Sequence, residues 1–252
     1  MRSRCPAFDQ VNSGSPDHQG FRSLIVNADD LGQDAGIDAG ILQAAARGIV
    51  TSASLMVRWP DASQAARAAV RQGISVGLHL DLGEWSCVDG SWFQLYAVTD
   101  RDDPAAVEAE VSRQATMFQR LLGSDPSHVD SHQHVHREGA VRAAAAALAE
   151  RLRIPLREQS RHVRYVGGFY GQGPGGAAYP VGITVQRLIA LLDELPVGVS
   201  ELSCHPGRSV TVSTMYRQER EVELETLCDP RVRSAIRERN IDLISFSQLS
   251  QR

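Results

Sequence analysis

Several apolar segments of the sequence end in an aspartate or a histidine that could carry out chemistry. These residues are Asp29, Asp30, His79, Asp130, His132 and His205. In parallel α/β proteins the carboxyl ends of the strands meet at one rim, where catalytic groups gather. One such residue alone is usually a turn cap or a satisfied core group. Four separate segments that deliver Asp or His to one rim predict a shared site.

The adjacent carboxylates of Asp29 and Asp30 repel each other unless they share a cation or a proton. Successive strand residues point to opposite faces, so both can face one site only where the strand ends. Gly32 follows closely and permits the necessary bend. One carboxylate could then ligate a metal ion while the other acts on water. The alternative is that both aspartates cap the helix that follows.

Three histidines recur at every second position from His132 through His134 to His136. In an extended chain they would share one face, and imidazole is a common ligand for zinc and related ions. His132 is nearest to the predicted strand end and is the expected ligand, whereas His134 and His136 are expected to contact substrate or support a ligand. An Asp with two histidines leaves coordination positions open, which is typical of catalytic metals. A solvated histidine-rich loop is the alternative.

Three further groups near these positions have simpler interpretations. Asp130 is expected to orient a ligand histidine or to bind substrate. Cys204 and His205 are neighbours in a strand and face apart, which disfavours a Cys–His nucleophile. The arginines at positions 157, 161 and 164 are expected to form a solvated rim, with an anion site as the alternative.

Apolar runs alternate with helical patterns along most of the chain. Strands are expected at 24–28, 52–57, 75–80, 128–131, 154–158, 198–204 and 242–246, and helices at 37–47, 61–72, 104–122, 138–152, 184–195, 217–227 and 229–239. Each helix can serve as the crossover between parallel strands. The pattern predicts a TIM-like (β/α) barrel with seven strands, and an open doubly wound sheet is the alternative. The segments 83–103 and 167–182 are expected to be long loops.

The composition excludes several classes of protein. The 252 residues include 26 basic residues, all of them arginine, against 30 acidic ones, so the formal charge is −4. The absence of lysine excludes enzymes that form a Schiff base through a lysine and hydrolases that bind nucleotides with a phosphate-loop lysine. The excess of acidic residues disfavours nucleic-acid binding. The sequence contains no run of 18 apolar residues, so no membrane span is predicted.

The remaining organisation is simple. Residues 1–20 are polar and are expected to be a loosely ordered tail, followed by a single domain over 21–252. The four cysteines form no CxxC pair, so neither a disulfide framework nor a cysteine zinc site is expected, and a reducing, cytoplasmic location is the default. A homo-oligomer is the default expectation for assembly.

Five motifs together resemble the YdjC-like carbohydrate deacetylases, which include chito-oligosaccharide deacetylases and hopanoid-biosynthesis-associated deacetylases. The motifs are NADDLG at 27–32, GIVTS at 48–52, GLHL at 77–80, DSHQHVH at 130–136 and CHPG at 204–207. The resemblance extends from residue 24 to 246. One departure is Leu31, where the family usually has Phe.

The resemblance implies a barrel of the polysaccharide-deacetylase kind that binds one divalent ion, magnesium or zinc. By motif, Asp30, His79 and His132 correspond to the metal ligands, Asp29 to the base and His205 to the acid. The implied reaction removes an acetyl group from an N-acetylated amino sugar, chito-oligosaccharide-like or lipid-linked, and releases acetate.

The sugar is expected to contact residues on the rim of the site. The candidates are Asp130, His134, Trp85 and Tyr170, with Trp92, Phe93 and Phe169 as further rings that could stack on sugars or anchor their loops in the core. Two other functions stay open at this point. One is metal-dependent hydrolysis of a phosphoester or a cyclic amide, and the other is non-catalytic carbohydrate binding.

Overall fold

The computed structural model describes residues 20–88 and 90–251. The predicted tail therefore lies, except for Gly20, outside the described residues. The principal sheet contains β1 (Arg22–Leu31), β2 (Ser52–Leu55), β3 (Ser75–Leu80), β6 (Val129–Ser131), β7 (Val163–Val166), β8 (Gly198–Cys204) and β9 (Ile241–Leu243). Its helices are α1 (Ala35–Arg47), α2 (Ala62–Arg71), α3 (Pro104–Leu122), α4 (Gly139–Leu152), α5 (Val185–Asp193), α6 (Gln218–Cys228) and α7 (Pro230–Glu238).

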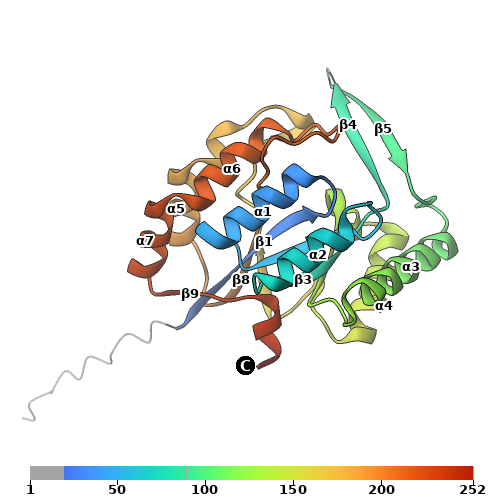
Figure 1. Cartoon of the computed structure of the whole chain (residues 1–252), viewed down its shortest axis with the longest axis horizontal. Coiled ribbons are helices and arrows are strands. Elements are labelled where there is room, and N and C mark those ends of the chain that lie inside the picture. The colour runs from blue at the N-terminus through green and yellow to red at the C-terminus, as the bar shows by residue number, and fades with distance from the viewer. Residues whose placement is uncertain (1–19, 89, 252) are drawn as a thin grey trace, which may run out of the picture.

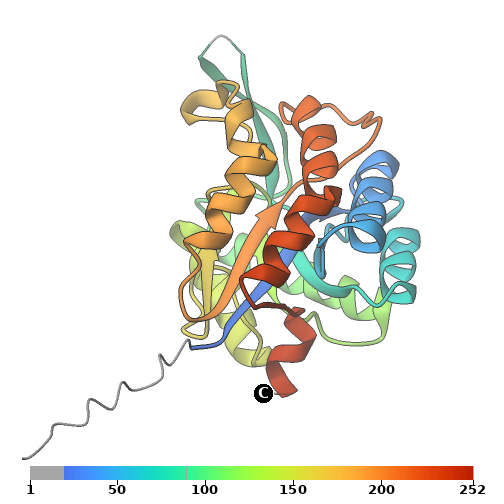
Figure 2. The same cartoon turned by 90° about the vertical axis from the view of Figure 1, so that its left-hand side faces the viewer.

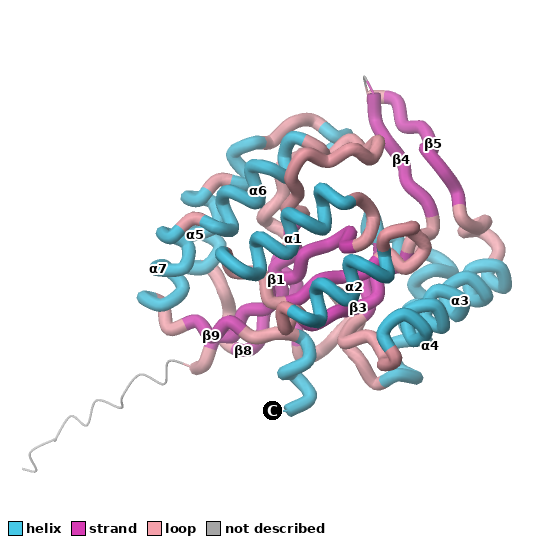
Figure 3. The backbone as a smooth tube through the Cα atoms, viewed as in Figure 1, coloured by secondary structure: helices cyan, strands magenta, loops and turns pink. Residues whose placement is uncertain are grey.

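The sheet is parallel throughout and has the order β6-β3-β2-β1-β8-β7. β1 is its central strand. β8 pairs along one edge of β1, while β9 pairs with the beginning of the other edge and β2 with its end. The helices surround the outside of the curled sheet (Figure 1, Figure 2), and the strands lie at the centre of the molecule (Figure 3).

The two faces of β1 have different neighbours. Leu24, Val26 and Ala28 belong to the large apolar core that includes residues of the surrounding helices. Ile25 points the other way and packs with a small apolar cluster that includes Phe246. Because strand residues alternate, Asn27 and Asp29 follow Ile25 onto the inner face of the curl. The inner face therefore changes from apolar to polar toward the carboxyl end of the strand.

The predicted barrel is confirmed as a parallel, curled α/β sheet but not as a closed seven-stranded barrel. The expected strand at 154–158 is reduced to one isolated bridge, in which Leu156 pairs with Val129 of the edge strand β6. β7 pairs only with β8 among the described strands. The result is a half-barrel whose two edges, β6 and β7, are not directly paired.

The prediction that residues 83–103 form a long loop is wrong. It contains an antiparallel hairpin of β4 (Gly83–Val88) and β5 (Ser91–Ala97), which projects from the body of the protein (Figure 1). The sequence Asp89-Gly90 between two runs with aromatic residues is a hairpin signal that could have indicated this element. The glycine-rich segment 167–182 contains an isolated bridge between Gln172 and Ala178 and the short 3-10 turns η2 (Pro174–Gly176) and η3 (Pro180–Ile183), the second of which ends one residue beyond the segment.

Among the described residues, no helix combines the length and the apolar character required to cross a bilayer.

Candidate active site

The two aspartates at the end of β1 face one site because the backbone bends between them. Asp30 has a left-handed φ of 69°, and Gly32 follows at 87°. Pairing between β1 and β2 shifts register between Ala28 and Leu31. A left-handed aspartate costs conformational energy, and such residues gather at functional sites. The bend brings the side chain of Asp30 back toward the face that Asp29 occupies.

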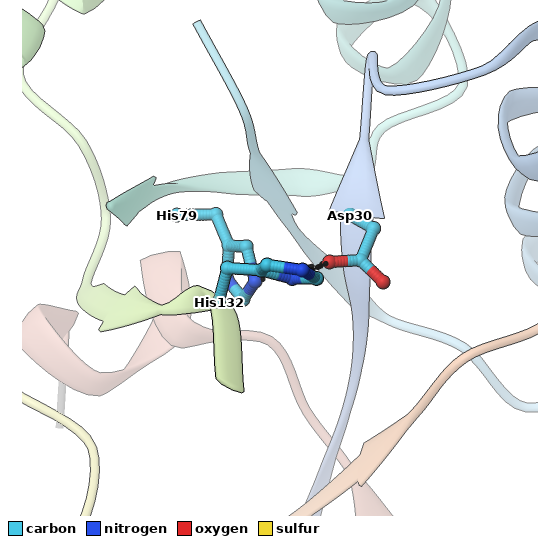
Figure 4. A group of neighbouring side chains, drawn as sticks. All are labelled: Asp30, His79 and His132. Atoms are coloured by element: carbon cyan, nitrogen blue, oxygen red, sulfur yellow. Dashed lines mark hydrogen bonds and ion pairs between the residues drawn. The ribbon is translucent and has the colours of Figure 1, made fainter. Parts of the chain in front are cut away.

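Asp30, His79 and His132 form a buried group of possible metal ligands (Figure 4). Oδ1 of Asp30 lies 3.2 Å from Nε2 of His79 and 2.9 Å from Nδ1 of His132. Burial opposes protonation of both rings, but the neighbouring carboxylates outweigh it and raise the pKa of His79 to about 10 and that of His132 to about 9. The group therefore attracts positive charge strongly.

A further carboxylate lies close to each histidine of this group, on the ring nitrogen that does not face Asp30. Asp130 lies 2.8 Å from Nδ1 of His79 and accepts a hydrogen bond of 2.6 Å from the hydroxyl of Ser54. The Nδ1–H of His79 can thus donate to Asp130 while Nε2 faces Asp30, so that Nε2 could ligate a metal ion once it loses its proton, as is usual for metal-ligating histidines. Glu84, buried at the start of β4, lies 3.7 Å from Nε2 of His132. Sequence reasoning missed Glu84 because it lies in the segment interpreted as a loop.

Arg157 is the largest departure from the sequence analysis. The prediction of a solvated rim is wrong for Arg157, which is buried, and holds for the exposed side chains of Arg161 and Arg164. The guanidinium of Arg157 binds Asp29 through two hydrogen bonds of 2.6 and 2.7 Å.

The same guanidinium lies 2.8 Å from Asp130 and donates to Glu201 at 2.7 Å. Three carboxylates offset the cost of burying the charge of Arg157. Arg157 also takes the place of a cation between Asp29 and Asp130, which with His79 form a second possible ligand group. Burial acts to raise the pKa of Asp29, but the charge and hydrogen bonds of Arg157 prevail and lower it.

His205 lies just after β8, on the other side of Asp29. Its Nε2 is 3.7 Å from Oδ2 of Asp29, and its Nδ1 is 3.8 Å from Oε1 of Glu223. Glu223 is buried in α6 and also accepts a hydrogen bond of 2.5 Å from the backbone N–H of His205. The half-buried ring of His205 contacts the rings of Tyr170 and Tyr216, with centroids 5.4 and 5.3 Å away.

Arg220 holds the second oxygen of Asp30. Its Nη2 donates to Oδ2 at 2.6 Å, its Nε donates to the carbonyl of Tyr216, and the side chain is buried. Asp30 therefore keeps Oδ1 for the two histidines. Neither Arg220 nor Glu223 carries a recognisable sequence signal, because both lie in a highly charged helix that resembles a solvated surface helix.

A cavity of about 730 Å³ opens over these groups. Its lining includes Asp29, Asp30, His79, His132, His205 and Arg220, together with the expected sugar contacts Trp85, Trp92, His134 and Tyr170. Phe169 is instead buried in the apolar core. Phe93 is exposed but is not part of the cavity wall. Asp130 is fully buried behind His79, away from the cavity.

The prediction that residues 132–136 are extended is wrong. The segment forms the 3-10 turn η1 (His132–Arg137), in which Gln133 and His134 have left-handed φ values of 52° and 53°. His132 consequently faces Asp30, while His134 and His136 lie next to each other with ring centroids 5.7 Å apart. His136 is fully buried and does not line the cavity.

Solved structures share this fold. A protein of Enterococcus faecalis V583, provisionally described as a cellobiose-phosphate cleavage protein, is 25% identical, with a TM-score of 0.72 and coverage of 91% of this chain and 99% of that one. A family 4 acetyl xylan esterase from Clostridium thermocellum, in complex with a cobalt ion, is 12% identical, with a TM-score of 0.53 over 91% of each chain. The second likeness concerns the fold alone.

Curated relatives match nearly the whole chain. A carbohydrate deacetylase of Geobacillus stearothermophilus and a chitooligosaccharide deacetylase of Serratia marcescens are each 32% identical, over 90% of this chain and 98% of their own. The sequence profile of the YdjC-like proteins matches residues 23–238. With the strand-end motifs that the resemblance was based on, these matches show that the chain belongs to the YdjC-like family.

Proposed function

We propose that this chain is a metal-dependent carbohydrate N-deacetylase that hydrolyses the acetamide of an N-acetylated amino sugar. The observation that carries the proposal is the meeting of Asp30, His79 and His132 beside Asp29 and His205 in one cavity. Relatives named carbohydrate deacetylases, 32% identical over most of the chain, support the same reaction.

The residues present fit a divalent ion. One carboxylate oxygen and two imidazole nitrogens come within 4.8 Å of one another, and the raised histidine pKa values record an excess of negative potential there. A divalent ion held by Asp30, His79 and His132 would polarise the acetamide carbonyl and promote the ionisation of water. Zinc or magnesium is proposed, and the two imidazoles favour zinc and similar ions over magnesium.

Asp29 is assigned the role of general base. Arg157 fixes both of its oxygens in one orientation and keeps the carboxylate ionised at neutral pH. Oδ1 of Asp29 also accepts a hydrogen bond of 2.9 Å from the amide of Asn27, but Oδ2 keeps a second lone pair and can still accept a proton from water while Asp29 is bound to Arg157. The guanidinium lowers the basicity of Asp29 in exchange for its precise placement.

His205 is assigned the role of general acid. Its ring lies on the far side of Asp29 and is held by contacts with Glu223, Tyr170 and Tyr216. An amine is a poor leaving group unless it is protonated as the C–N bond breaks. A proton held on the His205 ring would be transferred to the nitrogen of the sugar, and acetate and a free amino sugar would leave.

The substrate is proposed to be a chito-oligosaccharide-like or lipid-linked N-acetyl sugar. Trp85, Trp92 and Tyr170 provide aromatic surface in the cavity wall, which suits the apolar face of a sugar ring. The cytoplasmic location and homo-oligomeric state stay predictions from the sequence.

The test is acetate release by the purified, metal-loaded protein. The panel would contain N-acetylglucosamine, its β-1,4-linked dimer and trimer, and lipid- and nucleotide-linked N-acetyl sugars, each with and without a chelator. Chelator-sensitive acetate release that the Asp29→Asn variant lacks is the expected result. Absence of acetate from every substrate, with metal bound to the protein, would contradict the proposal and direct the next screen to phosphoesters.

A further inference from the structure

A third group of possible metal ligands shares no residue with the two groups described above. Donor atoms of His134, His136 and Glu158 lie within 4.8 Å of one another. Nδ1 of His134 is 3.7 Å from Oε1 of Glu158. No chemical step of the proposed deacetylation uses these three residues, although His134 is an expected sugar contact in the cavity wall.

The free nitrogens of the two imidazoles are the strongest sign of a ligand. Nδ1 of His134 and Nε2 of His136 are both buried, and neither has a hydrogen-bond partner among residues 20–88 and 90–251. A buried polar atom without a partner is costly, and native proteins seldom retain one without a reason. His136 as a whole is fully buried, so solvent cannot satisfy its ring.

The opposite nitrogen of each ring is held by a hydroxyl group. Nδ1 of His136 lies 2.7 Å from Oγ of Ser131, which also accepts the backbone N–H of His136 at 2.9 Å. Nε2 of His134 lies 3.4 Å from the hydroxyl of Tyr165. A ring fixed through one nitrogen while the other remains free has the arrangement typical of metal-ligating histidines.

We propose that His134, His136 and Glu158 form a second divalent-metal site, suited to imidazole-preferring transition ions such as Zn²⁺. Two imidazoles and one carboxylate match the ligand preferences of Zn²⁺ and disfavour Mg²⁺. The site is independent of the proposed deacetylase reaction. Because His134 lines the cavity, a bound ion would add positive charge to the cavity wall.

The buried charge of Arg157 opposes a cation near the two histidines, and Arg137 competes with it directly. The guanidinium of Arg137 pairs with both oxygens of Glu158, so an ion must share the carboxylate with it or displace it. The side chain of Arg137 is 48% exposed and can move into solvent. The second site is therefore expected to bind more weakly than the Asp30 group, where Arg220 leaves Oδ1 of Asp30 available.

The experiment counts metal ions in the full chain. The protein would be stripped with a chelator and titrated with Zn²⁺ by calorimetry, and Co²⁺ absorption would report the ligands. Two equivalents are expected, the tighter of which is lost in Asp30→Asn. The weaker one is lost in His134→Gln and in Glu158→Gln, while the exposed control His162→Gln keeps both. Arg137→Gln is expected to tighten the weaker site about tenfold, because a competing positive charge is removed.

Two results would overturn the second site. One is a single equivalent in the unmodified chain that disappears in Asp30→Asn. The other is a second equivalent that survives in both His134→Gln and Glu158→Gln. If His134→Gln fails to fold, Glu158→Gln still decides the matter, since glutamine keeps the size of this glutamate side chain, which is 25% exposed. The outcome does not depend on whether acetate is released from any sugar.

Discussion

The floor and the rim of the cavity are built in different ways. On the floor, Asp29, Asp30, His79 and His132 are buried and come from strand ends or the turn that follows a strand. On the rim, the β4–β5 hairpin carries Trp92 and other exposed apolar side chains away from the sheet. Reacting groups must be held to within a fraction of an ångström, which packed strands can provide. Recognition of a sugar ring tolerates more movement.

The links between charges show how the floor is held. Arg157 connects Asp29, Asp130 and Glu201, while Arg220 connects Asp30 to the backbone of Tyr216. A displacement of one carboxylate would leave a buried guanidinium partly unpaired, and this is costly. The hairpin is linked to the floor through Glu84 at its base, 3.7 Å from His132, and through two hydrogen bonds between the backbone of Trp85 and the side chain of Gln133, the neighbour of His132. We therefore expect floor substitutions to abolish function and rim substitutions to adjust affinity.

The largest expected effect comes from the ligand group. His79→Ala should remove metal and lower kcat/KM by about 10³-fold or more, because the site loses both the ligand and the electrostatic stabilisation that depends on it. Metal content and acetate release on the same sample would measure this.

Asp29→Asn should retain the metal and lose most of its turnover. Complete metal loss in Asp29→Asn would show that the two aspartates have exchanged roles.

The next effect concerns stability. Arg157→Met should lower the free energy of unfolding by about 3–5 kcal/mol, because three buried carboxylates lose their shared cation. Arg161→Met, four residues away and exposed, should change it by less than about 0.5 kcal/mol. Urea unfolding of both variants would measure the difference. An Arg157→Met protein as stable as the unmodified one would mean that the floor is not held by this arginine.

A third effect lies beneath the floor, where His128 stacks on Phe246 at a centroid distance of 3.8 Å. Burial lowers the pKa of His128 to about 4, and the charge of Arg157 adds to this effect. Between pH 6.5 and 4 the unfolded chain binds the proton more readily than the folded one, so stability falls as the pH decreases through this range. The loss attributable to His128 is about 3 kcal/mol when complete.

The measurement is the unfolding free energy at pH 7 and at pH 4, for the unmodified chain and for His128→Asn. Other groups titrate in both proteins, so the difference between their pH dependences isolates His128. The variant should be less stable at pH 7 and lose less stability on acidification. Equal losses in the two proteins would contradict the lowered pKa.

The same contrast explains what the sequence could predict. Short motifs place Asp30, His79 and His132 at strand ends, and parallel strands place those ends together, so this group follows from local pattern and fold class. Arg157 and Arg220 could not be predicted in this way, because their burial depends on carboxylates far away along the chain. Glu223 could not be predicted either, because its hydrogen-bond donors, His205 and Tyr216, meet it only in the folded chain. Arg157 meets Asp29 across 128 residues and Arg220 meets Asp30 across 190. Only the folded structure shows these pairs.

Backbone geometry accounts for the remaining differences. The left-handed residues Gln133 and His134 break the expected extended run and separate His132 from His136. The expected fifth strand is reduced to a bridge at Leu156, after which Glu158 turns away with a φ of 64°. Non-glycine residues with left-handed backbone conformations are uncommon, and no reliable sequence signal predicts them. The β4–β5 hairpin did have a sequence signal, the dipeptide Asp89-Gly90, so that element was predictable in principle.

The smallest effect is expected at the rim and compares two adjacent aromatic residues. Trp92 lines the cavity, whereas Phe93, its neighbour in β5, does not. Trp92 is 52% and Phe93 42% exposed, so their removal should affect stability little. Trp92→Ala should raise KM about five- to tenfold for a chito-oligosaccharide, since a stacking contact is worth about 1 kcal/mol, and should leave kcat nearly unchanged.

Phe93→Ala is the matched control and should leave both constants unchanged. Steady-state kinetics with the β-1,4-linked dimer and trimer would measure the two variants. A fall in kcat for Trp92→Ala would mean that the hairpin also positions the reacting acetamide, since a lost contact that binds ground state and transition state equally changes KM alone. The base of the hairpin gives such a result a physical route, because Glu84 begins the same hairpin and lies beside His132. In that case the rim would take part in placing the chemistry, and the division between floor and rim would hold only beyond Glu84.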